Sequence, residues 1–195
     1  MDLPPLRAVD EVRNIEVNGV ELETYFYHTP NTAKRPTLLF LHEGLGSAAT
    51  WRDFPRKVVS ETALPAIVYS RQGYGMSDRH IESYGCDFLH KEALEVLPAL
   101  LAKLQVERPM LVGHSDGASI ALIHAAMYPV AGVVVEAPHI YVEEKAITAI
   151  SDLRVKIRRA GLIQKMARFH KDPERAFRNW NNIWLNPDFS SWNII

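Results

Sequence analysis

Four short apolar runs, separated by segments with helical periodicity, constrain the fold of this 195-residue chain more than any other feature. The runs carry no charged residue and span positions 37–41, 66–69, 110–112 and 131–135. Strands that are apolar on both faces are typical of the middle of a parallel sheet that helices cover. The helical patterns lie at residues 51–61, 87–105 and 116–127. This alternation predicts a three-layer α/β fold with right-handed crossovers.

The start of the chain has a different pattern. Apolar and charged residues are interleaved near residues 12–18 and 20–28, on either side of Asn18-Gly19. An Asn-Gly pair between such segments is typical of a tight hairpin turn. We therefore predict two antiparallel strands before the parallel part of the sheet.

The pattern changes again after Pro138, where the strand signals stop. Apolar residues then recur at the spacing of amphipathic helices, and no further strand signal precedes the last residue. The sequence thus predicts an α/β core over residues 1–139, followed by a helical cap segment over residues 140–195.

Charge and composition exclude several classes of protein. Lys and Arg number 22 against 23 Asp and Glu, a balance that argues against a general nucleic-acid binder. The single cysteine, Cys86, excludes an internal disulfide framework. No zinc spacing, phosphate-binding loop or dinucleotide fingerprint is present, so no cofactor is implied. No apolar run is long enough to span a membrane, and residues 1–5 do not resemble a secretory signal, which favours a cytoplasmic location.

The sequence Gly113-His114-Ser115-Asp116-Gly117 carries the candidate chemistry. It follows a predicted buried strand and opens a predicted helix, and such a turn forces its middle residue into a strained conformation with positive φ. Glycines are then needed on both sides because the strand and helix backbones nearly touch. The turn would expose the Ser115 hydroxyl at the carboxyl edge of the sheet, where open α/β folds bind ligands. The alternative is a glycine-rich turn with an idle serine.

Three motifs in order resemble the α/β-hydrolase superfamily. They are the segment around Ser115, the loop at residues 42–47 and the turn at residues 71–78, and the resemblance runs from about residue 14 to residue 139. The helices beyond resemble the cap insertion of that superfamily. In the superfamily the turn that matches residues 71–78 is mostly structural.

The resemblance assigns roles to individual residues. Ser115 matches the nucleophile, and the backbone N–H of Asp116 matches one donor of the oxyanion hole. Gly44 matches the position of the other donor. Glu43 stands where many relatives have glycine, so Leu45 is an alternative donor.

The same resemblance places a catalytic acid and a histidine after two further strands, which do not occur before Ile195. We therefore expect the sequence to be the amino-terminal part of a longer hydrolase. Two signs favour this: residues 131–137 would form an open apolar sheet edge, and residues 184–195 end in apolar side chains with nothing obvious to pack on. The alternative is a short chain that covers the edge by forming a homodimer.

Within the sequence, His139 and Glu136 are the substitute base and acid to consider. Both lie at the carboxyl end of the last predicted strand, near the face expected for Ser115. Such an early histidine departs from the order of the superfamily, so a place in the pocket wall is the alternative for His139. Residues 1–195 alone are expected to show residual activity, unless His139 serves as the base.

These observations predict a serine hydrolase that acts on a small carboxylic ester or thioester through an acyl-enzyme. A non-catalytic binding module on the same fold is one alternative. A C–C bond hydrolase or a haloperoxidase-like enzyme is another. The predicted partner is a small-molecule substrate, without nucleic acid, membrane or cofactor.

Overall fold

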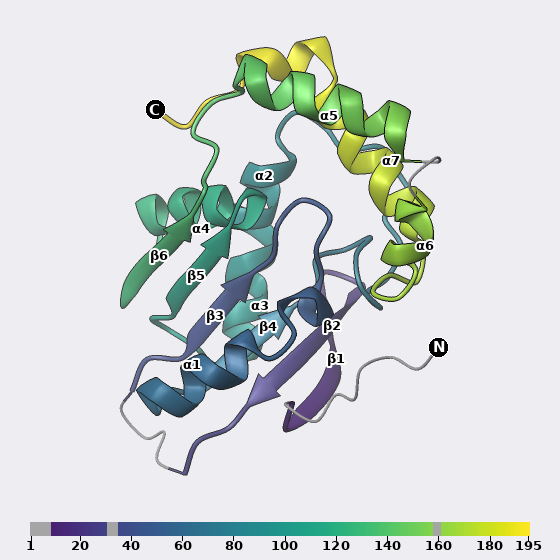
Figure 1. Cartoon of the computed structure of the whole chain (residues 1–195). Coiled ribbons are helices and arrows are strands. Elements are labelled where there is room, and N and C mark those ends of the chain that lie inside the picture. Colours follow the sequence, from purple (N-terminus) through teal and green to yellow (C-terminus); the bar gives the residue numbers. More distant parts are fainter. Residues whose placement is uncertain (1–8, 31–34, 158–160) are drawn as a thin grey trace.

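A six-stranded mixed sheet forms the centre of the molecule (Figure 1), in a computed structural model that describes residues 9–30, 35–157 and 161–195. The strands are β1 (Glu11–Val17), β2 (Val20–Tyr27), β3 (Leu38–Leu41), β4 (Ala66–Tyr69), β5 (Met110–His114) and β6 (Gly132–Glu136). Their order in the sheet is β1-β2-β4-β3-β5-β6. Residues 1–5, on which the cytoplasmic prediction partly rests, lie outside the described residues.

The direction of the strands confirms the predicted α/β class. β1 and β2 form an antiparallel hairpin, and β2 also pairs antiparallel with β4, whereas β3, β4, β5 and β6 run parallel. The hairpin turns at Asn18 and Gly19, whose φ angles are 52° and 81°. Both residues favour this left-handed region, as the sequence predicts.

Helices cover both faces of the sheet because the side chains of each buried strand alternate between them. Leu39 and Leu41 of β3 belong to the apolar core on one face, and Leu38 and Phe40 to the core on the other. The first core is covered by α2 (Phe88–Lys91), η2 (Glu92–Val96), α3 (Leu97–Lys103) and α4 (Asp116–Met127), and the second by η1 (Ala48–Trp51) and α1 (Phe54–Thr62).

The predicted helix at residues 87–105 is one helical stretch with a π-helical turn, η2, in its middle. Pro98 has no N–H group and cannot donate to the carbonyl four residues earlier, which disturbs the regular ladder. Two carbonyls of this turn instead accept hydrogen bonds from α4 and the residue after it. His124 Nδ1 contacts Ala93 O at 2.8 Å, and Tyr128 donates to Leu94 O at 3.2 Å.

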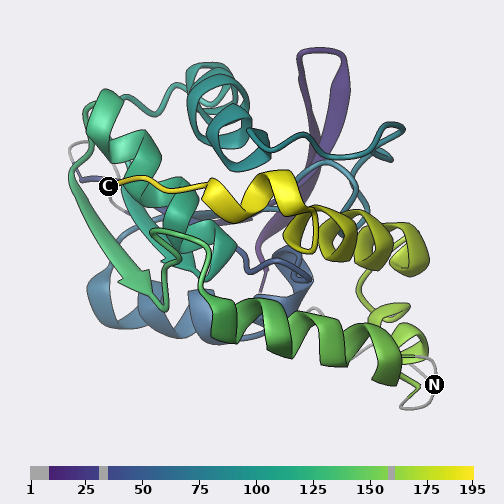
Figure 2. The same ribbon diagram turned by 90° about the horizontal axis from the view of Figure 1, so that it is seen from above.

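After β6 the described residues form helices and one isolated bridge, between Tyr141 and Asn193. The helices are α5 (Glu144–Lys156), α6 (Leu162–Met166), α7 (Pro173–Trp184) and η3 (Pro187–Ser191). They lie over the carboxyl ends of the parallel strands (Figures 1 and 2). The division into a core and a cap segment at residue 139 stays a prediction. In the described ranges, no helix has both the length and the apolar character needed to cross a membrane.

The expectation that residues 184–195 have nothing to pack on is wrong for the two tryptophans, although Ile195 is 92% exposed. Trp184 and Trp192 are both buried in the larger apolar core, and the ring of Trp192 stacks on that of Phe189. Trp192 Nε1 also donates to His90 Nδ1, at 3.3 Å. His90 belongs to α2 and lies far from Trp192 in the sequence, so the sequence alone does not reveal this contact.

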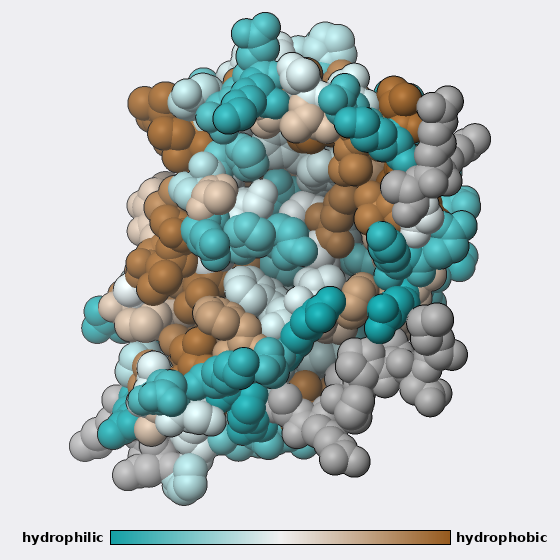
Figure 3. All heavy atoms as spheres, in the orientation of Figure 1, coloured by the Kyte–Doolittle hydropathy of each residue, from teal (hydrophilic) through white to brown (hydrophobic). Residues whose placement is uncertain are grey.

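Strand β6 forms one edge of the sheet, as predicted. Val134 in this strand is 56% exposed, which is unusual for a valine in a parallel strand. Figure 3 shows apolar side chains gathered on the side of the molecule where β6 lies. A homodimer that covers this edge stays a prediction.

One buried histidine ties the cap segment to two loops of the core. His170 Nδ1 accepts a hydrogen bond from the N–H of Gly75 at 3.1 Å, and Nε2 lies 3.0 Å from Leu45 O, to which it donates. This pair of partners requires the neutral ring with its proton on Nε2. Burial lowers the pKa of His170.

The elbow at Ser115 depends on two close backbone approaches. A Cβ atom on Gly117 would lie 2.0 Å from Leu41 O, and one on Gly113 would lie 2.4 Å from Gly117 O. Neither neighbour is a flexible side chain, so α4 can begin this close to β3 and β5 only with glycine at both positions.

Gly117→Ala is therefore expected to lower the free energy of unfolding by roughly 2–3 kcal/mol, because the added methyl group must push backbone atoms apart. Urea denaturation measures this change. Gly132→Ala is the matched control, since a Cβ there meets the flexible end of Met110 at 3.2 Å. Equal losses in both variants would contradict the prediction.

Stability is expected to fall as the pH drops below 6.5, the ordinary pKa of histidine. His170 has a lowered pKa in the folded chain, so below pH 6.5 the unfolded chain takes up the proton first. Each such histidine contributes a slope of up to about 1.4 kcal/mol per pH unit, and burial also lowers the pKa of His42 and His124.

Denaturation series across this range should show a smaller slope for His170→Asn. An unchanged slope in His170→Asn would refute the assignment.

Candidate active site

Ser115 stands at the turn from β5 into α4 with φ 51° and ψ −120°. The predicted positive φ is thus confirmed. The N–H of Ser115 donates to Glu136 O at 2.9 Å, which fixes the elbow to the end of the neighbouring strand β6. Ser115 is half-buried and lines a cavity of about 370 Å³.

Four segments meet around this cavity. They are the loop at residues 43–45, the elbow at residues 114–115, the segment from Ala137 to Glu143, and Trp180 of α7. The first three come from the carboxyl ends of parallel strands, the edge at which such folds bind ligands. The fourth comes from the cap segment, so the cavity lies beneath its helices.

Gly44, one predicted oxyanion donor, lines this cavity, and Asp116, the other, directly follows the lining residue Ser115. The described part of the chain offers no hydrogen-bond acceptor to the N–H of Gly44 or to the N–H of Asp116. Asp116 is the first residue of α4, where N–H groups have no partner inside the helix. Leu45, the alternative donor, also lines the cavity, and its carbonyl accepts from His170.

The loop that carries Gly44 is held by a buried histidine. His42 Nδ1 donates to Glu43 O at 2.7 Å, and Nε2 accepts the N–H of Arg71 at 3.1 Å. Complete burial, followed by the charge of Arg71, places the pKa of His42 well below its usual range. His42 is therefore neutral and holds the loop in place.

Glycine at position 44 allows α7 to approach the loop. A Cβ atom on Gly44 would lie 2.0 Å from Trp180 Nε1. The indole of Trp180 thus covers the backbone of this loop at the cavity wall.

The structure brings His139 to Ser115. Its Nε2 lies 3.5 Å from Ser115 Oγ, a long contact that is still within reach of a proton transfer after a small movement. Ser119 of α4 fixes the backbone of His139, since its Oγ accepts the N–H at 3.0 Å and donates to the carbonyl at 2.6 Å. The ring also packs edge-on against Trp184, with a centroid distance of 4.7 Å.

A carboxylate lies on the other side of the same ring, but it is not that of Glu136. Glu143 Oε2 lies 3.4 Å from His139 Nδ1, and its side chain is 48% exposed. Among the described residues, the side chain of Glu136 makes no hydrogen bond or ion pair with His139; its carbonyl holds the elbow instead. Sequence reasoning missed Glu143, although an acid four residues after His139 was a signal that could have identified it.

Comparisons with known proteins point to one family. A family model described as "Alpha/beta hydrolase family" matches residues 38–193. The human protein "Serine hydrolase BPHL" is 30% identical over 116 residues, which cover 59% of this chain and 38% of that protein. The bovine "Protein phosphatase methylesterase 1" is 26% identical over 125 residues, covering 64% of this chain and 32% of that protein. This chain thus spans less than half the length of these relatives.

Solved structures show the same fold. A "CIB-like hydrolase" from Thermoplasma acidophilum superposes with a TM-score of 0.57 at 23% identity, covering 66% of this chain and 62% of that one. A membrane phospholipase A superposes with a TM-score of 0.59 at 20% identity, covering 69% of this chain and 41% of that one. The family model matches residues 38–193, which is most of this chain. The chain therefore belongs to the alpha/beta hydrolase family.

Proposed function

We propose that the protein is a serine hydrolase that cleaves a small carboxylic ester or thioester through an acyl-enzyme on Ser115. The observation that carries this proposal is the Ser115 hydroxyl at a cavity that Gly44 also lines, with the N–H groups of Gly44 and of the adjoining Asp116 left without acceptors among the described residues. Relatives named as a serine hydrolase and as a methylesterase support it. A cavity of about 370 Å³ favours a small substrate. The cytoplasmic location stays a prediction.

In this mechanism Ser115 Oγ attacks the substrate carbonyl carbon and gives its proton to a base. The negative charge that develops on the carbonyl oxygen is stabilised by the N–H groups of Asp116 and of Gly44. Each such donor contributes on the order of 3 kcal/mol to the transition state. Loss of the alcohol or thiol leaves the acyl group on Ser115, and water then releases it.

We further propose His139 as the base, with Glu143 as the carboxylate that orients its ring. The support is geometric: Nε2 faces Ser115 Oγ at 3.5 Å, and Nδ1 faces Glu143 at 3.4 Å. A proton taken up at Nε2 makes the ring cationic, and the carboxylate beside Nδ1 stabilises that charge. This arrangement departs from the order of the superfamily, in which the histidine comes last in the sequence.

Ser115→Ala is expected to abolish covalent labelling by a fluorophosphonate probe, because the hydroxyl that attacks phosphorus is removed. Mass spectrometry of the labelled protein should locate the adduct on the peptide that contains Ser115. The control, Ser190→Ala, alters an exposed serine in η3 and should label like the unmodified protein. An unlabelled protein, or an adduct on another serine, would favour a non-catalytic binding module.

His139→Asn is expected to slow labelling of Ser115 by about 100-fold, the lower range for loss of a general base. Glu143→Gln should slow it less, by about tenfold, since the base remains but loses its orienting charge. His114→Asn is the matched control, because His114 lines the same cavity without contacting Ser115 Oγ in the described structure. If His139→Asn labels at the original rate, His139 is a wall residue and the base lies elsewhere.

A further inference from the structure

A buried arginine lies where the loop of Gly44 meets the elbow of Ser115. We propose that Arg71 is a positioning residue that holds both N–H donors of the oxyanion hole, a proposal that rests on the proposed function. The side chain of Arg71 is 6% exposed. The residue belongs to the turn at residues 71–78, for which the family resemblance indicates a mostly structural role. Its guanidinium group contacts both the loop of Gly44 and the first residue of α4.

The first contact fixes the peptide bond between Glu43 and Gly44. Glu43 O accepts hydrogen bonds from Arg71 Nη2 at 3.0 Å and from the N–H of Gly46 at 3.0 Å, in addition to the one from His42. A trans peptide is planar, so its N–H points away from its carbonyl oxygen. By holding the carbonyl of Glu43, Arg71 sets the direction in which the N–H of Gly44 points.

The second contact is electrostatic and lies at the start of α4, where Asp116 Oδ2 has no hydrogen-bond partner among the described residues. Arg71 Nη2 lies 4.0 Å from Asp116 Oδ2, and the Asp116 side chain is 1% exposed. Because the carboxylate and the second oxyanion donor belong to the same residue, holding the side chain of Asp116 restricts its N–H. One nitrogen atom of Arg71 therefore contacts both segments of the predicted oxyanion hole.

Charge compensation explains why this arrangement is stable in the interior. Burial raises the pKa of Asp116, and Arg71 is the strongest influence in the opposite direction. Burial opposes the charge of Arg71 as well, but Tyr74, Asp116 and Glu92 outweigh it and raise the pKa of the guanidinium. The guanidinium also lies over the ring of Tyr74, at 5.1 Å from its centroid. Removal of Arg71 would leave the carboxylate of Asp116 buried without its counter-charge.

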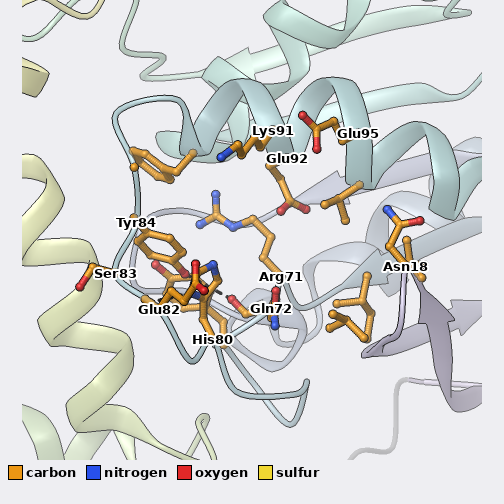
Figure 4. Close-up of a pocket in the computed structure, with 17 residues that line it drawn as sticks. Asn18, Arg71, Gln72, His80, Glu82, Ser83, Tyr84, Lys91, Glu92 and Glu95 are labelled. Carbon is orange, nitrogen blue, oxygen red and sulfur yellow. Dashed lines mark hydrogen bonds between the residues drawn. The ribbon is translucent and has the colours of Figure 1, made fainter.

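A second cavity, of about 340 Å³, makes this inference testable by chemical rescue. Arg71, Tyr84 and Glu92 line it, and Figure 4 shows the Arg71 side chain extending between the loop of Tyr84 and the helix of Glu92. Arg71 Nε is buried and has no hydrogen-bond partner among the described residues. Truncation of Arg71 would thus open a space, joined to this cavity, that guanidinium ion can enter.

The experiment measures two-step labelling of Ser115 by a fluorophosphonate, which separates reversible binding of the probe from the covalent step. Arg71→Ala should slow the covalent step by about 10- to 100-fold, somewhat less than the loss of an oxyanion donor, with little change in probe binding. Millimolar guanidinium should restore at least part of the rate. Urea at the same concentration should not, since it carries no charge.

Two further variants complete the test. Arg79→Ala removes a neighbouring arginine that is 58% exposed, and should label at the original rate with or without guanidinium. Arg71→Lys keeps the charge but lacks the planar guanidinium, and should label more slowly than the unmodified protein. If Arg71→Ala does not fold, Arg71→Lys decides the test. A slower covalent step in Arg71→Lys supports the proposal, and an unchanged one overturns it.

Three results would overturn the proposal. One is an unchanged covalent step in folded Arg71→Ala, and another is a loss that guanidinium does not reverse in a folded variant. The third is a loss confined to probe binding, which would make Arg71 part of the pocket wall. Failure of the unmodified protein to label at Ser115 is a separate outcome, because it refutes the proposed function itself.

Discussion

The close packing of three backbone segments at the elbow is the constraint on which the site depends. Gly113 is the penultimate residue of β5 and Gly117 is the second residue of α4, and a side chain at Gly117 would collide with the carbonyl of Leu41. This contact brings the end of β3, which leads into the loop of Gly44, next to the first turn of α4. Gly44 and Ser115 line one cavity, and Asp116 directly follows Ser115, because these backbones touch.

The central fold could be predicted from the sequence because its signals are local. Uncharged apolar runs marked the parallel strands β3 to β6, and Asn18-Gly19 marked the hairpin between β1 and β2. The elbow at Ser115 was equally local, since a strand, two glycines and a helix adjoin one another in the sequence. Its positive φ followed from the steric demands of that turn alone.

Features that depend on contacts between distant segments could not be predicted in the same way. The packing of Trp192 depends on His90 of α2, and the placement of His139 depends on Ser119 and Trp184. Glu143 is only four residues from His139, but its link to Ser115 depends on where the fold places His139. The turn motif at residues 71–78 likewise indicated only a structural role. It did not reveal that Arg71 contacts the loop of Gly44 and the first residue of α4.

The contact between Gly44 and Trp180 links two positions that are far apart in the chain. A larger residue at position 44 fits only if the indole at position 180 is replaced or withdrawn, and a smaller residue at position 180 would uncover the glycine backbone. The mutational histories of the loop and of α7 are therefore coupled: in descendants of this sequence, a larger residue at position 44 should appear only where position 180 has also changed.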